Sequence, residues 1–539
     1  MQHSINLSEI NFGRDDATLE ANGLLAKVFL KTSVYNRVKN GGKLLVTGRK
    51  GSGKSAICFY LIDALKAEGR EAIRVTTGDL SRTRIQQLRA TAIDDKESFE
   101  SAWRYVFLVK IAIRLIELID QGEFDEIYSE HENIKQLRGI RDFLSQNDEI
   151  DKNIAQKLGS FLNRFSKFGV KVPGGLETTA EARQVESIRD LSAALDKFQN
   201  CILRLIRIAK GFKITILVDE VDDIWNSTEE SKHLITGLLD AITKVNGNLN
   251  PSALVIVFLR SDIWDSLEFF NKDKFRSVDE RINWSKEDLK RLITNRGKIA
   301  ANLADDFDTE SVWKLLFEKK VGEQHSFDYI IDRTLKRPRE VIQYCNLALS
   351  FAQDANRSRI TEEDILAAEA RYSIWKLDDL INEFSVQYPF LRDTFNVFDG
   401  FQSSFTKEQI APRFEKSKAM LSQKFNELSG LDLDDFLQLL FGIGFLGAKV
   451  LGEIFYLHDQ LDYKRIVLPY IVDLEAIVIH PAFRLALGLN PPSSQDSRKY
   501  NNYGRDHINI NQIGNINTGN IRIGGDAGGN IIRDDRNES

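Results

Sequence analysis

Residues 48–55 read GRKGSGKS and follow the apolar run KLLVT at residues 43–47. This octapeptide matches the pattern G-x-x-x-x-G-K-[ST], and the sequence after it, SAICFYLIDALKAEG, has a helical pattern. A strand, a glycine-rich loop and a helix in this order let backbone N–H groups wrap phosphates, while the helix N-terminus adds positive potential. The sequence therefore predicts a nucleotide-phosphate site, and its binding residues are Gly48, Arg49, Lys50, Gly51, Ser52, Gly53, Lys54 and Ser55. Within this set, Lys54 is expected on the β- and γ-phosphates and the Ser55 hydroxyl on Mg²⁺.

A second apolar run ends in two carboxylates. Residues 214–220 read ITILVDE, so Asp219 and Glu220 stand at the end of a buried strand. Buried carboxylates need a cation or a substrate as partner. We expect Asp219 to hold Mg²⁺ and Glu220 to polarise the attacking water, which favours hydrolysis. Asp222 and Asp223, just beyond, are expected to be a solvated strand end.

Length and composition limit the classes of protein to which the chain can belong. The chain has 539 residues, 42% hydrophobic and 28% charged, which suits three or four domains and excludes a wholly disordered protein. The three cysteines are widely spaced and form no C-x-x-C pair, which indicates a reducing compartment without structural zinc. The net charge of −6 argues against a protein coated in nucleic acid.

Neither a signal peptide nor a membrane span is expected. The first residues lack a basic start followed by an apolar run. The one membrane-like stretch, residues 436–457, is interrupted by Gln438, Lys449 and Glu453, which are costly in lipid. We therefore expect a cytoplasmic protein without a membrane partner.

Strand-like and helical segments alternate through residues 1–300, which predicts an α/β fold with a parallel sheet. The clearest strands are continuous apolar runs, as in sheets covered on both faces, at residues 43–47, 72–76, 213–218 and 253–259. Residues 83–210 are read as a helical insertion, interrupted by a hairpin or loop at residues 168–175. The predicted organisation is a P-loop ATPase core at 1–295, a helical lid at 296–373, a third domain at 374–490, and a linker with a low-complexity tail at 491–539. SKED (285–288) and TEED (361–364) are expected to cap lid helices.

Two arginines stand where they could reach a nucleotide. The strand at residues 253–259 is followed by Arg260, which is expected near the acidic strand and the γ-phosphate. KRPRE at residues 336–340 opens a helix, so that Arg339 in its first turn could clamp the nucleotide from the lid. The planar fork of arginine pairs bidentately with phosphate.

These motifs resemble those of AAA+ and STAND-type P-loop ATPases, most closely the initiator (origin-recognition) and STAND branches. The resemblance covers about residues 10–490. Within this range, five motifs are similar to those of a bacterial P-loop ATPase family often found near defence genes. They read NFGRDDA (11–17), GGKLLVTGRKGSGKSAI (41–57), LVDEVDD (217–223), FLRSDIWD (258–265) and INWSKEDLKRLI (282–293). The resemblance implies ATP and Mg²⁺ as cofactors, Arg260 at the sensor 1 position and Arg339 at sensor 2. It also implies an arginine finger for a neighbouring subunit at Arg276, with Arg281 as the rival candidate.

The third domain resembles a winged helix, with FLQLLFGIGF at residues 436–445 followed by a hairpin candidate and VIHPAFRLALGLN. In the initiator branch such a domain binds DNA, whereas in STAND proteins it mostly holds the closed state. Residues 371–490 carry 12 basic and 16 acidic side chains, a net charge of −4. A domain that depends on phosphate contacts is normally basic, so the charge favours a protein-contact role.

The tail, residues 504–532, reads GRDHININQIGNINTGNIRIGGDAGGNII. Asn ladders and dry isoleucine seams are ingredients of a cross-β assembly, and glycine and asparagine disfavour a helix. QIGNIN at residues 512–517 resembles the RHIM core of signalling amyloids, and residues 521–524 are a looser copy with Arg522 where glutamine is usual. The alternative is a disordered glycine-rich spacer.

These observations favour an ATP-hydrolysing switch of STAND/AAA+ type, with Glu220, Arg260 and Arg276 as catalytic residues, in bacterial antiviral defence. Its expected partners are further copies of the same chain and an effector protein that carries a matching tail. The alternatives are an initiator-like ATPase that acts on DNA and an ATP-dependent scaffold with a disordered tail.

Overall fold

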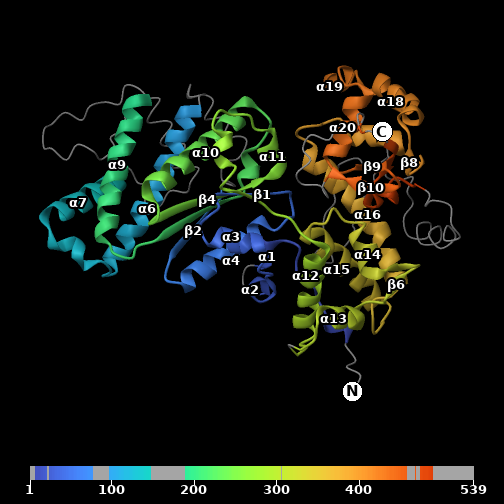
Figure 1. The fold of residues 1–539 in the computed structure, drawn as a ribbon, viewed down its shortest axis with the longest axis horizontal. Helices are drawn as coiled ribbons and strands as arrows, with labels where there is room; N and C mark the ends of the chain where they lie inside the picture. Colours follow the sequence, from blue (N-terminus) through green and yellow to red (C-terminus); the bar gives the residue numbers. More distant parts are fainter. Residues whose placement is uncertain are drawn as a thin grey trace, which may run out of the picture. The chain divides into compact units, whose positions relative to one another are not determined.

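A computed structural model describes residues 6–20, 24–76, 96–146, 188–304, 306–457, 468, 471 and 474–489 of the chain (Figure 1). Two sequence predictions lie outside these residues. They are the hairpin or loop at residues 168–175 and the cross-β character of the tail at residues 504–532.

Five parallel strands form the central sheet in the order β2-β3-β4-β1-β5. The strands are β1 (Leu45–Gly48), β2 (Glu71–Thr76), β3 (Ile214–Asp219), β4 (Ala253–Arg260) and β5 (Asp279–Arg281). The first four agree with the predicted apolar runs to within two residues at either end. The edge strand β5 was not predicted, because its three residues are all charged.

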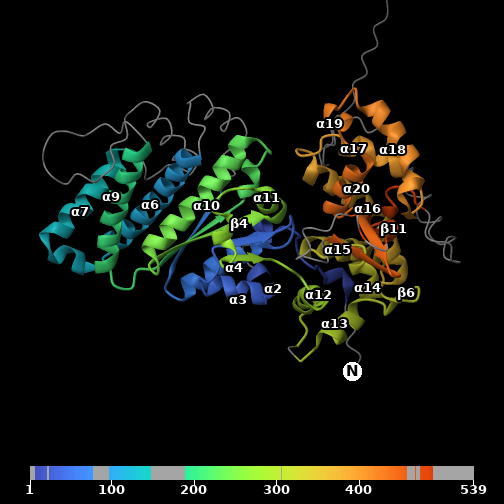
Figure 2. The ribbon, with the colours of Figure 1, turned by 45° about the horizontal axis from the view of Figure 1, so that its top comes forward.

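Helices cover both faces of the sheet, as Figures 1 and 2 show. One face carries α3 (Ser33–Lys39) and α4 (Lys54–Ala67), whose apolar side chains form a core with inward residues such as Val46 and Leu217. The other face carries α6 (Lys96–Asp120), α9 (Ile188–Ile208) and α10 (Glu229–Leu249) over a larger core. This burial explains why the strands read as continuous apolar runs.

The described part of the chain between β2 and β3 is mainly helical. It contains α6, η2 (Asp125–Ser129), α7 (His131–Gln146) and α9. Gly237 of α10 permits the close contact with α6, because a Cβ there would lie 2.8 Å from the backbone nitrogen of Glu100. The inserted helices α6 and α9 therefore pack into the same core as the sheet.

The helical part of the chain after β5 begins with Ser285, whose side chain accepts a hydrogen bond from the Asp288 N–H and caps α12. Its helices are α12 (Lys286–Ala300), α13 (Thr309–Leu316), α14 (Ser326–Ile331), α15 (Pro338–Asp354) and α16 (Glu362–Phe384). The predicted capping box of Thr361 and Asp364 is present at the start of α16. A short pair of strands, β6 (Lys320–Val321) and β7 (Gln324–His325), interrupts the predicted helical run. Helix α12 runs across residue 295 and α16 runs across residue 373, so neither helix ends at a predicted domain boundary.

The third domain combines helices with a four-stranded sheet in the order β10-β9-β11-β8. Its hairpin, predicted from GAKVLGEIFY, is β9 (Leu446–Val450) paired antiparallel with β10 (Glu453–Tyr456). The other elements are α17 (Leu391–Thr394), η5 (Phe395–Phe398), β8 (Ser404–Phe405), α18 (Lys407–Leu421), α19 (Asn426–Ser429), α20 (Leu433–Gly442), β11 (Leu474–Ile479) and α21 (Pro481–Arg484). Helix and hairpin together account for the apolar stretch at residues 436–457.

Within the described residues, no helix is both long enough and apolar enough to cross a membrane. The remaining short elements are η1 (Leu7–Glu9), α1 (Ala17–Glu20), α2 (Leu24–Val28), η3 (Val221–Ile224), α11 (Ser261–Ser266) and η4 (Lys272–Phe275).

Candidate functional site

The glycine-rich loop connects β1 to α4, and its backbone conformation depends on glycine. Gly51 and Gly53 have φ angles of 78° and 97°, in the left-handed region that other residues disfavour. A Cβ on Gly51 would lie 3.0 Å from the Cβ of Arg339. Helix α4 starts at Lys54 without a side-chain cap, which leaves its first N–H groups available to an anion.

Lys54 is held among oxygen atoms at the mouth of the loop. Its side chain is 9% exposed, and its Nζ donates to the carbonyl oxygen of Gly48 at 3.1 Å. The Oδ2 atom of Asp222 lies 3.5 Å from the same nitrogen. The ammonium group is thus positioned by the loop itself.

The two acids at the end of β3 share one cation, Arg74 of the neighbouring strand β2. Arg74 Nη2 donates to Asp219 Oδ2 at 2.8 Å and to Glu220 Oε1 at 2.7 Å. Its guanidinium group also lies 4.5 Å from the centre of the Phe59 ring on α4. Asp219 is 1% exposed, so Arg74 supplies the charge that its buried carboxylate requires. Sequence reasoning missed Arg74, and the available signal was a basic residue inside an apolar strand.

Asp222 points into the site, so its prediction as part of a solvated strand end was wrong. The Arg260 N–H donates to Asp222 Oδ1 at 3.0 Å, and Lys54 lies on its other side. Burial raises the pKa of Asp222, and Lys54 opposes that rise. The reason is the tight turn η3, which follows Glu220 at φ 59° and carries Asp222 back toward the strand ends. Asp223 is exposed, as expected.

Arg339 in the first turn of α15 touches both the glycine-rich loop and the N-terminal segment. Its N–H donates to the Gly51 carbonyl at 3.4 Å. Its guanidinium group donates to the Asp15 carbonyl at 3.2 Å and to Asp16 Oδ2 at 3.3 Å. Burial acts to raise the pKa of Asp16, but hydrogen bonds from Thr18 and the charge of Arg339 lower it. The predicted lid arginine therefore lies beside the loop, paired with a segment that sequence reasoning had not assigned to the site.

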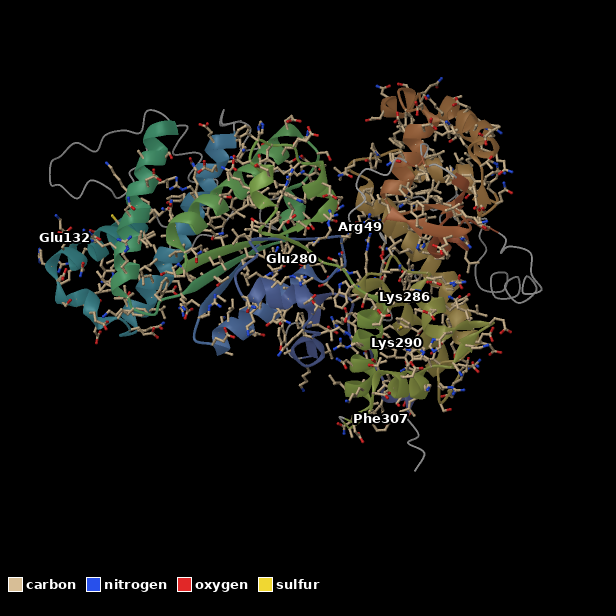
Figure 3. The ribbon with its side chains drawn as sticks, viewed as in Figure 1. Arg49, Glu132, Glu280, Lys286, Lys290 and Phe307 are labelled. Atoms are coloured by element: carbon tan, nitrogen blue, oxygen red, sulfur yellow. The ribbon has the colours of Figure 1, made fainter. Side chains whose placement is uncertain are left out.

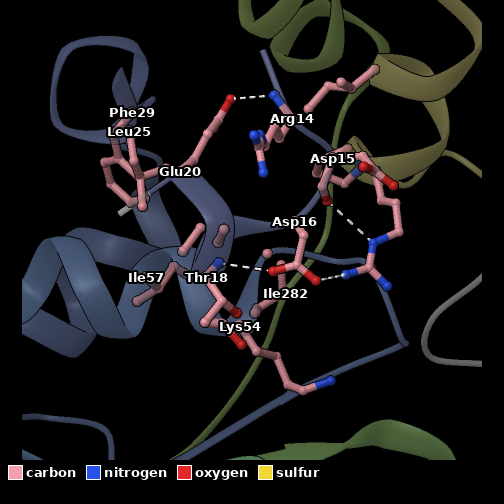
Figure 4. Close-up of a pocket in the computed structure, with 18 of the residues that line it drawn as sticks. Arg14, Asp15, Asp16, Thr18, Glu20, Leu25, Phe29, Lys54, Ile57 and Ile282 are labelled. Atoms are coloured by element: carbon pink, nitrogen blue, oxygen red, sulfur yellow. Dashed lines mark hydrogen bonds and ion pairs between the residues drawn. The ribbon is translucent and has the colours of Figure 1, made fainter. Parts of the chain in front are cut away.

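A cavity of about 360 Å³ joins these groups. Figure 4 shows Leu25, Phe29 and Ile57 on one side of it and Lys54 on another. Glu20 at its wall accepts a bidentate ion pair from Arg296 of α12, with contacts of 2.7 and 2.8 Å. The apolar end of the cavity suits the base of a nucleotide, and the glycine-rich loop beside it suits the phosphates.

The cavity is rich in carboxylates, and this bears on which cofactor fits. Seven acidic side chains line it against five basic ones. The acidic residues are Asp15, Asp16, Glu20, Asp219, Glu220, Asp222 and Asp223, and the basic residues are Arg14, Lys50, Lys54, Arg296 and Arg339. A polyphosphate alone would be repelled, whereas Mg²⁺ prefers such oxygen ligands. The donor set, with Ser55 and Asp219 among its oxygens, therefore fits a nucleotide accompanied by Mg²⁺.

The other predicted site residues do not line this cavity. The side of the loop with Gly48, Arg49 and Ser52 faces a second cavity. The Nη2 atom of Arg49 (labelled in Figure 3) donates to the Gly442 carbonyl at the end of α20. Arg260 makes a bidentate ion pair with Asp262, with contacts of 2.6 and 3.1 Å.

The two arginine-finger candidates differ in their surroundings. Arg276 is exposed, and no ion pair joins it to another described residue. Arg281 pairs with both carboxylate oxygens of Asp265, at 2.6 and 2.7 Å.

The sheet order, the glycine-rich loop after β1 and the acidic end of β3 define an α/β protein with a P-loop. Residues 287–381 match the FunZ-associated C-terminal helical domain. The chain is 24% identical over 491 residues to the putative transposon gamma-delta 80.3 kDa protein of Escherichia coli (strain K12), covering 87% of this chain and 65% of that protein. It is also 24% identical over 169 residues to the allergen Alt a 2 of Alternaria alternata, covering 31% of this chain and 88% of that protein. The chain thus spans just under two thirds of the length of the E. coli relative.

Solved structures give weaker likenesses. The ORC2 protein of Aeropyrum pernix in its ADPNP-ADP complexes has a TM-score of 0.32 at 12% identity, with 92% of this chain and 95% of that one covered. Drosophila ORC bound to DNA has a TM-score of 0.29 at 12% identity, covering 93% and 90%. Cdc6p from Pyrobaculum aerophilum has a TM-score of 0.26 at 10% identity, covering 87% and 91%. These scores are too low to carry an argument about activity or partners.

Proposed function

We propose that the chain is an ATP-binding and ATP-hydrolysing switch. The observation that supports this most directly is the convergence of Lys54, Asp219 and Arg339 on one cavity, from the loop, the acidic strand and the lid. These residues are far apart in sequence, and each carries the chemistry that a phosphate or its metal requires.

In this proposal, each side chain has a separate task. Lys54 binds the β- and γ-phosphates, and Ser55 and Asp219 are the protein ligands of Mg²⁺. When bound, Mg²⁺ would neutralise part of the negative charge of the phosphates. Glu220 orients and polarises a water molecule, and its Oε2 atom can accept from that water while Arg74 holds Oε1.

Arg339 would couple the nucleotide to the lid. It stands at the start of α15, so a phosphate that attracts its guanidinium group competes with Asp16 for it. Binding would thereby change the balance between two positions of the lid, because a ligand shifts an equilibrium by its different affinity for the two states.

The test uses the full chain with ATP and Mg²⁺, following binding by calorimetry and turnover by phosphate release. Lys54→Ala should abolish binding, whereas Glu220→Gln should keep binding and stop turnover. Arg291→Met, on the exposed side of α12, is the matched control and should change neither. Unchanged ATP hydrolysis in Glu220→Gln would contradict the proposed role of Glu220 in polarising the attacking water.

We also propose that ATP promotes self-association and that Arg276 acts on a neighbouring copy's nucleotide. Its exposure supports Arg276 over Arg281, which is already paired with Asp265. ATP-dependent oligomerisation, measured by light scattering, should be lost in Arg276→Ala while ATP binding remains. Assembly that is indifferent to substitution of either arginine would contradict this role.

The defence role and signalling through the tail to an effector are proposals that the sequence alone supports. The initiator-like alternative receives no support from the third domain, where Lys449 of the hairpin is already paired with Glu475 at 3.1 Å. Tight duplex binding with a steep dependence on salt concentration would revive that alternative.

A further inference from the structure

A second cavity lies against the other side of the glycine-rich loop. It has a volume of about 810 Å³, and it shares only Ile282 and Trp284 with the nucleotide cavity. The loop, the start of α15, the end of α16 and helix α20 all contribute to its wall. We call it the junction cavity and define it by Arg49, Trp284, Arg337, Gln387, Tyr388 and Gly442.

A buried arginine with an unused donor lines the junction cavity. The side chain of Arg337 is 5% exposed, and its Nη1 donates to the Lys50 carbonyl at 3.1 Å and to Glu383 at 3.0 Å. Its Nη2 atom is buried and has no hydrogen-bond partner among the described residues. A buried donor without a partner is costly, and a bound acceptor would remove that cost.

Arg49 adds a second donor on the same wall. Its Nη2 donates to the Gly442 carbonyl at 3.3 Å, while its Nη1 is buried without a partner in the described part of the chain. No carboxylate forms an ion pair with Arg49 among these residues. Burial, with Arg337 nearby, lowers the pKa of Arg49 to about 10, so the side chain stays charged at neutral pH.

The acidic residues of the wall do not cancel this charge. Asp262 is held by Arg260 and Asp265 by Arg281, each through two oxygen contacts. Asp435 is exposed. Five basic residues line the junction cavity against three acidic ones, so the net charge of its lining is positive.

Aromatic rings give the cavity a place for a flat group. Trp284, Phe384 and Tyr388 line it, and the Trp284 indole N–H donates to the Ser52 carbonyl at 2.9 Å, which fixes the ring beside the loop. Rings of this kind stack on nucleobases, and arginine forks bind phosphate. The volume also falls in the range of small-molecule sites, about 300–1,000 Å³.

We propose that the junction cavity binds a small organic phosphate of mononucleotide size, with its phosphate on Arg49 and Arg337 and its ring against Trp284 or Tyr388. Such a ligand contacts the glycine-rich loop from the side opposite the ATP phosphates. It also contacts α16 and α20, so it joins the loop to the lid and the third domain. This inference does not depend on ATP hydrolysis.

The test separates the two cavities by substitution. Lys54→Ala in the full chain serves as background, because it disables the ATP site. AMP, GMP, CMP, UMP and inorganic phosphate are titrated by calorimetry. Into this background we introduce one of three substitutions. Arg49→Met removes a donor, Gln387→Trp narrows the junction cavity at a residue outside the glycine-rich loop, and Arg291→Met is the control outside both cavities.

At least one mononucleotide should bind with one site per chain. Its affinity should fall at least about tenfold in Arg49→Met and in Gln387→Trp and stay within about twofold in Arg291→Met, a tenfold loss being 1.4 kcal/mol. Failure of every mononucleotide to bind up to about 1 mM would overturn the proposal. Binding that both junction substitutions leave unchanged would also overturn it. Inorganic phosphate that binds as tightly as the mononucleotides would contradict the role of the rings.

Discussion

Replacing Arg74 with methionine tests the charge balance at the end of β3. Methionine keeps an apolar contact with Phe59 but removes the guanidinium group from Asp219 and Glu220. Asp219 is 1% exposed and would be left without its cation, and removing one partner of a buried ion pair costs about 3–5 kcal/mol. Arg74 is 18% exposed and Glu220 35%, so solvent screens part of the interaction. We therefore expect the free energy of unfolding to fall by about 3 kcal/mol, at the lower end of that range.

Mg²⁺ with ATP should restore part of this loss, because a cation then lies again beside Asp219. The stabilisation by saturating ATP and Mg²⁺ should consequently be larger in Arg74→Met than in the unsubstituted chain. Urea unfolding, with and without ligand, measures both quantities.

The matched control is Arg70→Met, next to the start of β2. Arg70 lies 3.9 Å from exposed Glu68 and donates a long hydrogen bond of 3.5 Å to the Thr215 hydroxyl, and a surface ion pair of this kind contributes less than about 1 kcal/mol. If Arg74→Met costs no more than this control, or if ATP and Mg²⁺ stabilise both variants equally, the reasoning about the buried carboxylate is refuted.

Three further predictions concern other parts of the chain. Gly51→Ala, at φ 78° and 3.0 Å from the Arg339 Cβ, should cost about 1–2 kcal/mol and weaken ATP binding in calorimetry, whereas unchanged affinity would contradict the loop geometry. Burial holds the pKa of His480 well below its usual value, so the unfolded chain binds the extra proton. Stability should therefore fall by about 1.4 kcal/mol between pH 7.5 and 5.5, in a urea series that His480→Asn makes less pH-dependent, and an equal slope in that variant would refute the assignment. Ile513→Asp with Ile523→Asp should abolish fibres with a spacing near ~4.7 Å and leave ATP hydrolysis intact, whereas fibres that persist would leave the tail as a spacer.

The local sequence pattern was sufficient to predict the parts of the fold that bury apolar surface. Strands β1 to β4 could be predicted because burial on both faces selects continuous apolar runs, and the loop at residues 48–55 could be predicted because its glycines are needed for its shape. Strand β5 has only the charged residues 279–281, so its membership in the sheet depends on pairing with β1 and leaves no local signal.

The missed site residues depend on contacts between distant segments. Arg74 reaches Asp219 across 145 residues of sequence, through the parallel register of β2 and β3. Asp15 accepts a hydrogen bond from Gln343, 328 residues away, and nothing near either residue indicates the other. The position of Asp222 depends on the left-handed conformation of Glu220, which a sequence pattern does not reveal.

The charged edge of the central sheet has a consequence for self-association. On β5, Glu280 (labelled in Figure 3) is held by Arg37 through contacts of 2.6 and 2.9 Å, with Lys43 at 3.6 Å, and Arg281 is held by Asp265. A three-residue edge strand made only of paired charges is a poor template for a further strand, which is how natural sheets avoid edge-to-edge aggregation. Strand addition to the central sheet is therefore disfavoured at β5, so self-association of the chain through this edge is not expected to use backbone pairing.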